Sequence, residues 1–201
     1  MTTVSTPNVA WVAGVGASAG LGAALARRFA RGGLTVAITG RNESRLRTIA
    51  KEIRDAGGQA QVLPGDVSHP AEVERLTATL RQTGTLRSAL FNAGNMVRGP
   101  ALDITPEQFE STWRGSTYAG FLFVRAAREY GPQGVHVAHI IIDGGIDGER
   151  LRSTATERAA AAGEDGLLHP DSITDTYWHL HQQPRNAWTH ELDLRPFKER
   201  F

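Results

Sequence analysis

The sequence predicts an α/β fold in which a parallel β-sheet lies between two layers of helices, a doubly wound three-layer α/β/α arrangement. Two observations lead to this prediction. Apolar runs typical of buried strands alternate with helical patterns from residue 8 to residue 142, as successive βαβ units require. A glycine-rich run over residues 14–22 joins the first strand to the first helix. The 201 residues suffice for one domain, which we expect to span residues 1–201.

The first βα unit carries the most informative feature of the chain. Residues 8–13 predict a buried strand, and apolar residues recur at helical spacing over residues 21–29. A glycine-rich turn that opens a helix presents backbone N–H groups to an anion, most often the diphosphate of a dinucleotide. In such a loop we expect Gly16 to permit the tight turn, Gly20 to let the backbone approach the diphosphate, and Gly22 to allow close packing of helix against strand.

The following segments continue the alternation of strands and helices. Further strands are expected at residues 34–39, 60–63, 86–92 and 135–142, the last of them buried along almost its whole length. Helices are expected around residues 46–53 and 73–80 and over residues 105–130. Ser68 is the expected N-cap of the helix around residues 73–80. The expected buried side of the helix over residues 105–130 comprises Phe109, Trp113, Gly120, Val124 and Ala127.

The C-terminal part is less regular. Residues 148–168 are interpreted either as a mobile flap or short helix over a ligand, or as a plain surface excursion. A helix is expected over residues 171–183, where Pro184 ends it. Residues 188–194 alternate between apolar and polar side chains, which predicts a last strand at a sheet edge.

Composition limits the partners and the compartment. A net charge of +1 gives no basic field for nucleic acid, so we expect none as a partner. No apolar stretch is long enough for a membrane span. The chain has no cysteine and shows no secretory leader, which favours the cytoplasm. Metal binding is not expected, because His136 and His139 face opposite sides of a strand and His179 and His181 opposite sides of a helix.

Several motifs together resemble the short-chain dehydrogenase/reductase family. Residues 15–22 are similar to its phosphate loop, Asp66-Val67 to its adenine-contacting pair, and residues 91–94 to its Asn-Ala-Gly signature. Residues 143–147 resemble the loop that holds the nicotinamide carboxamide, although Gly148 stands where the family has threonine. The resemblance implies a Rossmann-type fold, an oxidoreductase activity and a dinucleotide cofactor. The cofactor contacts that it implies are Gly16, Ser18, Ala19, Gly20, Leu21, Gly22, Arg41, Asn42, Asp66, Val67, Asn92, Ala93, Gly94, Gly144 and Ile146.

The end of the second strand favours NADP(H) over NAD(H). An acidic residue there would bind the ribose 2′-hydroxyl and repel a 2′-phosphate. This chain instead has Gly40-Arg41-Asn42, with Arg45 one helical turn further on. A guanidinium group suits a phosphate because it can donate two parallel hydrogen bonds to it. The alternative is that Arg41 merely lies on a solvated helix start.

The chain departs from the family between residues 123 and 131. There the family has a strand with a catalytic serine and a helix with a Tyr-x-x-x-Lys pair, and here the two flanking helices resemble one spliced helix ahead of the turn at residues 131–134. The fold is therefore expected to lack one βα unit. A phenol is a poor acid at neutral pH without a nearby cation. The candidate substitutes for the missing catalytic residues are Arg114, Thr117 and Tyr118, which could form a polar site with Ser116. The alternative is that Arg114 is a solvated cation beside a packed Tyr118. Tyr177 and His181 share a helix face and are interpreted as a packed pair.

Three classes of function follow from these patterns. The chain is an oxidoreductase or other cofactor-assisted enzyme that acts on a small molecule with substitute residues, a catalytically inactive nucleotide-binding partner of an active reductase, or a deletion product retained for structural reasons. The successive apolar residues 121–124 point around much of the helix. A second covering surface is therefore expected, most simply from a homodimer.

Overall fold

The computed structural model describes residues 6–130 and 136–198. The strands are β1 (Asn8–Ala13), β2 (Thr35–Thr39), β3 (Gln59–Val62), β4 (Thr85–Phe91), β5 (His139–Ile142) and β6 (Glu191–Leu194). The α-helices are α1 (Leu21–Arg31), α2 (Glu43–Asp55), α3 (Pro70–Thr83), α4 (Pro106–Trp113), α5 (Ala119–Tyr130), α6 (Glu149–Thr154), α7 (Thr156–Ala162) and α8 (Pro170–Gln182). A π-helical segment, Arg114–Tyr118, joins α4 to α5.

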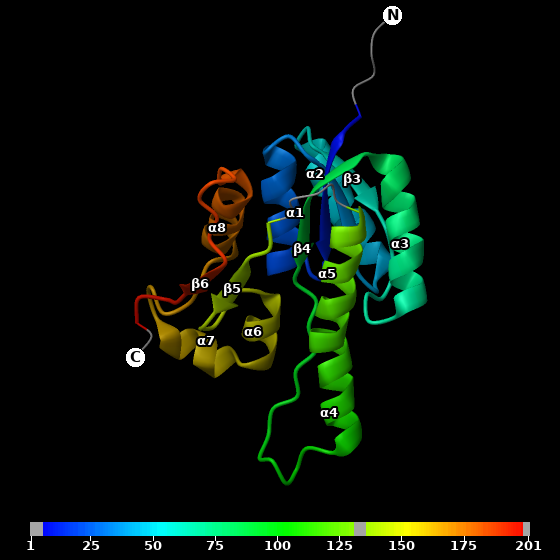
Figure 1. The fold of residues 1–201 in the computed structure, drawn as a ribbon. Helices are drawn as coiled ribbons and strands as arrows, with labels where there is room; N and C mark the ends of the chain where they lie inside the picture. The colour runs from blue at the N-terminus through cyan, green and yellow to red at the C-terminus, as the bar shows by residue number, and fades with distance from the viewer. Residues whose placement is uncertain (1–5, 131–135, 199–201) are drawn as a thin grey trace, which may run out of the picture.

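The main sheet is parallel and has the strand order β3-β2-β1-β4. Helices α1 and α2 cover one face, with α8 packed against α1, and α3 and α5 cover the other face, so the predicted three-layer α/β fold is confirmed (Figure 1). The alternation along β1 explains how one strand serves both layers: Ala10 and Val12 lie in the core under α1, whereas Val9 and Trp11 lie in the core under α5.

The described strands form two sheets rather than one. Strand β5 pairs only with β6, in parallel, and neither pairs with β4. The prediction of a long, almost fully buried strand over residues 135–142 was therefore wrong: β5 is four residues long, His139 is exposed and the other three are only partly buried. A two-stranded sheet with helices on part of its surface cannot enclose a strand as a central position in a larger sheet does. Val135 and the turn expected at residues 131–134 lie outside the described residues.

The helix predicted over residues 105–130 exists, but its buried side was partly misassigned. Thr105 and Gln108 form the expected capping box at its start. Phe109, Trp113 and Val124 are exposed, whereas Phe123 is buried against Trp11, with ring centroids 4.2 Å apart. Phe109 and Trp113 lie on α4, which extends beyond the strands in Figure 1. Val124 lies on α5, whose core side is instead formed by residues that include Phe123 and Ala127.

Two smaller corrections concern helix ends. The N-cap of α3 is His69 and not Ser68, which is buried and donates its backbone N–H to Asp66 at 2.9 Å. The last strand is shorter than the predicted residues 188–194 and begins at Glu191. It pairs on one side only, as the predicted edge position requires.

Candidate dinucleotide-binding site

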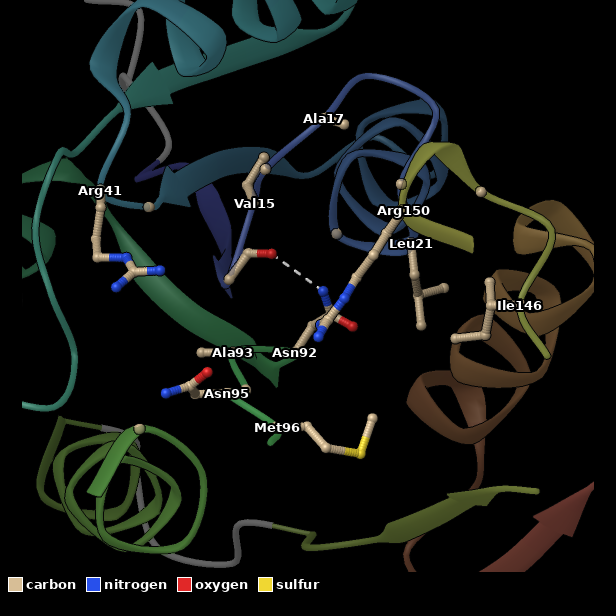
Figure 2. Close-up of a pocket in the computed structure, with 18 of the residues that line it drawn as sticks. Val15, Ala17, Leu21, Arg41, Asn92, Ala93, Asn95, Met96, Ile146 and Arg150 are labelled. Atoms are coloured by element: carbon tan, nitrogen blue, oxygen red, sulfur yellow. Dashed lines mark hydrogen bonds between the residues drawn. The ribbon is translucent and has the colours of Figure 1, made fainter. Parts of the chain in front are cut away.

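A pocket of about 1030 Å³ lies at the carboxyl ends of β1, β2 and β4. Its walls come from the loops that follow these strands, from α4 and the π-helical segment, and from α6 and α7 (Figure 2). The strand order reverses between β1 and β4, because β2 and β3 follow β1 toward one edge of the sheet and β4 lies toward the other edge. Open α/β sheets bind their ligands at such a point.

The glycine loop is fixed by contacts with both neighbouring strands. The backbone N–H groups of Gly14 and Val15 both donate to the Thr39 carbonyl at 3.0 Å. Gly14 has φ +86°, and a Cβ on it would lie 2.3 Å from the Ala93 nitrogen. The turn that needs glycine is therefore Gly14, which corrects the assignment of this role to Gly16. A Cβ on Gly22 would lie 2.5 Å from the Gly14 carbonyl oxygen, which explains why the helix packs so closely here.

The start of α1 leaves its first amides free of side-chain caps. Gly20 occupies the N-cap position and makes no side-chain hydrogen bond to the helix. A Cβ on Gly16 would meet nothing within 4 Å, so the backbone beside these amides is open to the pocket. Free N–H groups at a helix start are suited to bind an anion such as a phosphate group.

Ser18 does not take part in the pocket surface. Its hydroxyl donates to the Glu52 carboxylate at 2.9 Å and 3.0 Å, and Arg27 donates to the Ser18 carbonyl at 2.6 Å. This network ties the loop to α1 and α2. The structure therefore gives Ser18 a supporting role, and Ala19 is also absent from the wall.

Arg41 and Asp66 define one end of the pocket. The Arg41 side chain extends into it in Figure 2, and Arg45 lines the same wall. Asn42 uses its side-chain oxygen as the N-cap of α2, accepting from the Arg45 amide at 3.1 Å. Partial burial would raise the pKa of Asp66, but hydrogen bonds from Ser68 and the charge of Arg41 outweigh burial and lower it. Asp66 is therefore an anion at neutral pH.

The far end is built around the end of β4. The Asn92 side chain donates to the Gly14 carbonyl at 3.0 Å and so joins β4 to the glycine loop (Figure 2). Beyond it, Asn95 exchanges hydrogen bonds with Ser116, whose hydroxyl donates to the Asn95 carbonyl at 2.9 Å. This pair holds the π-helical segment against the loop that follows β4.

The segment over residues 148–168 forms a wall of the pocket, with α6 in its first part. A Cβ on Gly148 would lie 3.2 Å from the Ala19 carbonyl oxygen, so this segment touches the glycine loop. Glu149 lies 3.8 Å from Arg45 of α2. The helical alternative is thus the observed one, and whether the segment moves stays a prediction.

Most residues predicted to contact a cofactor meet in this one pocket. Those that line it are Gly16, Gly20, Leu21, Gly22, Arg41, Asn42, Asp66, Val67, Asn92, Ala93, Gly94, Gly144 and Ile146. Sequence reasoning missed Met96, Arg98, Ser111, Arg150 and Arg158, which also line it. These residues lie in loops and on the short helices, where no periodic pattern or family motif marks a position. The one sequence signal concerns the three arginines among them, each of which lies within about ten residues of a glycine-rich segment.

The three candidate catalytic residues separate in the structure. Arg114 lines the pocket, but Thr117 and Tyr118 do not. Tyr118 stacks on Trp113 at a centroid distance of 5.4 Å, and the Arg114 guanidinium lies 5.7 Å from the Tyr118 ring centre. Of the two interpretations, these contacts agree with a cation beside a packed tyrosine, and the three residues do not form a polar site at the pocket. Burial raises the pKa of Tyr177 to about 12, and this residue belongs to the core under α1 rather than to the pocket.

The described residues show neither a metal cluster nor a membrane span. No group of three or more His, Asp or Glu side chains there is placed to hold a metal ion. No helix in residues 6–130 or 136–198 is both long and apolar enough to cross a membrane.

Comparison with known proteins assigns the family. The model for short chain dehydrogenases matches residues 10–142. The chain is similar to the short-chain dehydrogenase/reductase eriH of Hericium erinaceus, with 32% identity over 161 residues that cover 77% of this chain and 64% of the relative. It is also similar to the glucose 1-dehydrogenase of Gluconobacter oxydans, with 38% identity over 97 residues, 47% of this chain and 36% of the relative. The chain thus spans less than two thirds of the length of these curated relatives.

A solved structure of a short-chain oxidoreductase has a similar fold. The metagenomic short-chain oxidoreductase in complex with NADP has a TM-score of 0.69 and 25% identity, over 96% of this chain and 98% of the other. The glycine loop, the Asp66-Val67 pair and Asn92 all line one pocket. The chain therefore belongs to the short-chain dehydrogenase/reductase family.

Proposed function

We propose that this chain binds NADP(H) in the pocket at the ends of β1 and β4. The observation that carries the proposal is the uncapped start of α1 beside an open glycine loop, within a pocket of about 1030 Å³. Such a helix start favours a diphosphate. When bound, the cofactor would supply or accept a hydride, and the residues of this chain would hold and orient it.

The preference for the 2′-phosphorylated cofactor rests on Arg41. This guanidinium extends into the pocket at the end of β2, and Arg45 lines the wall one turn further on. The neighbouring Gly40 and Asn42 carry no negative charge that would repel a phosphate. The NADP bound to the metagenomic relative agrees with this preference.

The proposal is tested by titrating NADPH and NADH into the wild type and Arg41→Ala. We expect the wild type to bind NADPH more tightly. The substitution should cost about 1.5–3 kcal/mol of NADPH binding, as for a hydrogen bond to a charged group, and leave NADH binding nearly unchanged. Equal affinities in the wild type, or a preference for NADH that survives Arg41→Ala, would reject the NADP(H) assignment.

We further propose that carbonyl reduction by this chain is absent or very slow. Among the described residues that line the pocket there is no tyrosine, lysine or histidine. General acid–base catalysis contributes about 10²- to 10⁴-fold to such rates. Asp66, the acidic residue at the Arg41 end, is held in its anionic form and cannot donate a proton at neutral pH.

A broad panel of ketones and alcohols with NADPH or NADP⁺ tests this second point. Turnover at ordinary enzyme rates, about 1–10³ per second, would contradict it and require a substitute acid or electrophile. Ser111 and Arg114 are the residues to substitute first in that case, because both line the pocket. That result would favour a cofactor-assisted enzyme of small molecules.

An inactive partner protein is the second candidate function. Phe109, Trp113, Phe121 and Val124 are exposed along the helix from α4 to α5. Exposed apolar surface of this kind marks a protein interface. We propose a homodimer through this helix as the simplest assembly, and a complex with an active reductase as the alternative.

A further inference from the structure

Arg150 is a pocket residue that no sequence motif identified. It lies on α6, directly after the segment in which Gly148 touches the glycine loop at Ala19 and Gly20. Its neighbour Glu149 approaches Arg45 of α2 at 3.8 Å. These contacts bring the start of α6 beside the loop that precedes α1, so the side chain of Arg150 begins close to the uncapped helix start.

The direction of the side chain is clear in Figure 2. Arg150 extends from α6 into the pocket past Leu21 and toward Asn92, and all three residues line the same pocket. It therefore crosses the space between the start of α1 and the end of β4. A dinucleotide held at the glycine loop with its adenosine toward Arg41 has to pass its diphosphate through this space.

The charge of Arg150 has no counterpart in the described part of the protein. No hydrogen bond or ion pair of its guanidinium group occurs there, whereas nearby acidic residues already have partners. Glu149 lies near Arg45, and Asp147 accepts two hydrogen bonds from Arg152, at 2.5 Å and 2.8 Å. An arginine directed into a pocket without a carboxylate partner is suited to an anionic ligand.

We propose that Arg150 binds the diphosphate of the cofactor from the side opposite to the α1 amides. The inference rests on the proposed dinucleotide binding and adds a specific contact to it. The diphosphate would lie between two positive groups, the partial charge of the helix start and the guanidinium of α6. Because the wall of the pocket supplies this contact, cofactor binding would also hold α6 against the glycine loop.

The role of Arg150 differs from that of Arg41 in a measurable way. Both NADPH and NADH contain the diphosphate, and only NADPH contains the 2′-phosphate. Arg150→Gln should therefore weaken both dinucleotides equally, by about 10- to 100-fold for a charge-assisted contact. Arg41→Gln should weaken NADPH alone. The ligand 2′-AMP lacks the diphosphate and should respond to Arg41→Gln and not to Arg150→Gln.

Isothermal titration calorimetry of the full chain with NADPH, NADH and 2′-AMP measures these affinities. Arg81→Gln is the matched control, because Arg81 is an exposed arginine at the end of α3, outside the pocket wall. Arg150→Lys keeps the charge but not the two parallel donors and should bind both dinucleotides with intermediate affinity. Thermal unfolding without ligand should be the same for the wild type and Arg150→Gln, because no internal partner is lost.

The outcomes separate the two proposals. If the wild type binds NADPH but Arg150→Gln binds it equally well, the diphosphate contact is wrong and dinucleotide binding stands. If Arg150→Gln weakens NADPH and 2′-AMP but not NADH, Arg150 contacts the 2′-phosphate and the inference is overturned. If the wild type binds none of the three ligands, the proposed function fails and the inference fails with it.

Discussion

At the scale of single residues, the glycines of the loop have different physical reasons to be glycine. Gly14 needs it for a positive φ and for its approach to Ala93, and Gly22 for its approach to the Gly14 carbonyl. A Cβ on Gly16 would face open space. The sequence pattern predicted the loop but assigned the tight turn to Gly16, because spacing alone does not give backbone angles.

Gly22→Ala should therefore destabilise the fold. Its Cβ would lie 2.5 Å from a backbone oxygen and 3.0 Å from the Asn92 side-chain nitrogen, so backbone must move. Overpacking of this kind costs about 1–3 kcal/mol of unfolding free energy, measurable by urea denaturation. Gly16→Ala is the control and should unfold like the wild type while binding NADPH less tightly. Similar stabilities of the two variants would contradict this account of the loop.

His181 gives the stability a pH dependence. Burial, and second the charge of Arg87, hold the pKa of His181 below its usual range, and its ring accepts or donates a hydrogen bond with Ser88 at 2.6 Å. The unfolded chain thus binds this proton at a higher pH than the folded chain. The stabilising effect is complete above the ordinary value of about 6.5 and is lost as pH falls through it toward the lower folded pKa.

His181→Gln should consequently reduce the loss of unfolding free energy between about pH 7 and pH 5. The measurement is urea denaturation of the wild type and the variant at both values. The exposed His179→Gln on the same helix is the control and should keep the wild-type loss. An unchanged loss in His181→Gln would show that other groups dominate the acid sensitivity.

At the scale of elements, the short helices α6 and α7 are where sequence reasoning was weakest. A six-residue and a seven-residue helix offer too few turns for an apolar periodicity to be recognised. Their position against the glycine loop depends on Gly148 and on the Arg45–Glu149 approach, which are tertiary contacts. Long periodic elements such as α1 and α2 were instead predicted closely.

Cofactor binding should protect this segment from proteolysis. Trypsin can cleave after Arg150, Arg152 and Arg158, which are exposed. If NADPH is held between α6 and the glycine loop, cleavage at these sites should slow several-fold when the cofactor is present. Peptide mapping by mass spectrometry follows it, with the sites after Arg81 and Arg128 as internal controls. Equal slowing at all sites would indicate global stabilisation rather than closure of this segment.

At the scale of the whole molecule, the layers were predictable and the division of the sheet was not. The period-two alternation of β1 and the amphipathic α1 and α2 determine a three-layer core. The sequence led us to expect that one βα unit is missing, but sequence patterns predict elements and not which strands pair with each other. In the described residues β5 and β6 pair with each other and leave β4 with β1 as its one strand partner.

The proposed homodimer rests on the helix that runs from α4 to α5. Trp113, Tyr118 and Phe121 stack in succession on its surface, at centroid distances of 5.4 Å and 6.4 Å. Phe109 is 68% exposed and Phe121 is 58% exposed, so the sheet does not cover this face. A second copy of the chain, related by a two-fold axis and in contact through the same helix, could bury these residues on both protomers.

Light scattering with size-exclusion chromatography should find a dimer at tens of micromolar, and Trp113→Glu/Phe121→Glu should convert it to a folded monomer. Leu102→Glu is the control, because Leu102 is 99% exposed and lies in the loop before α4. A stable dimer buries about 800 Å² per partner, so two charges within the patch suffice to oppose it. A well-behaved wild-type monomer would exclude the homodimer. Aggregation of the wild type that a related active reductase relieves would instead support the mixed complex, in which this chain contributes a nucleotide-binding surface without its own catalysis.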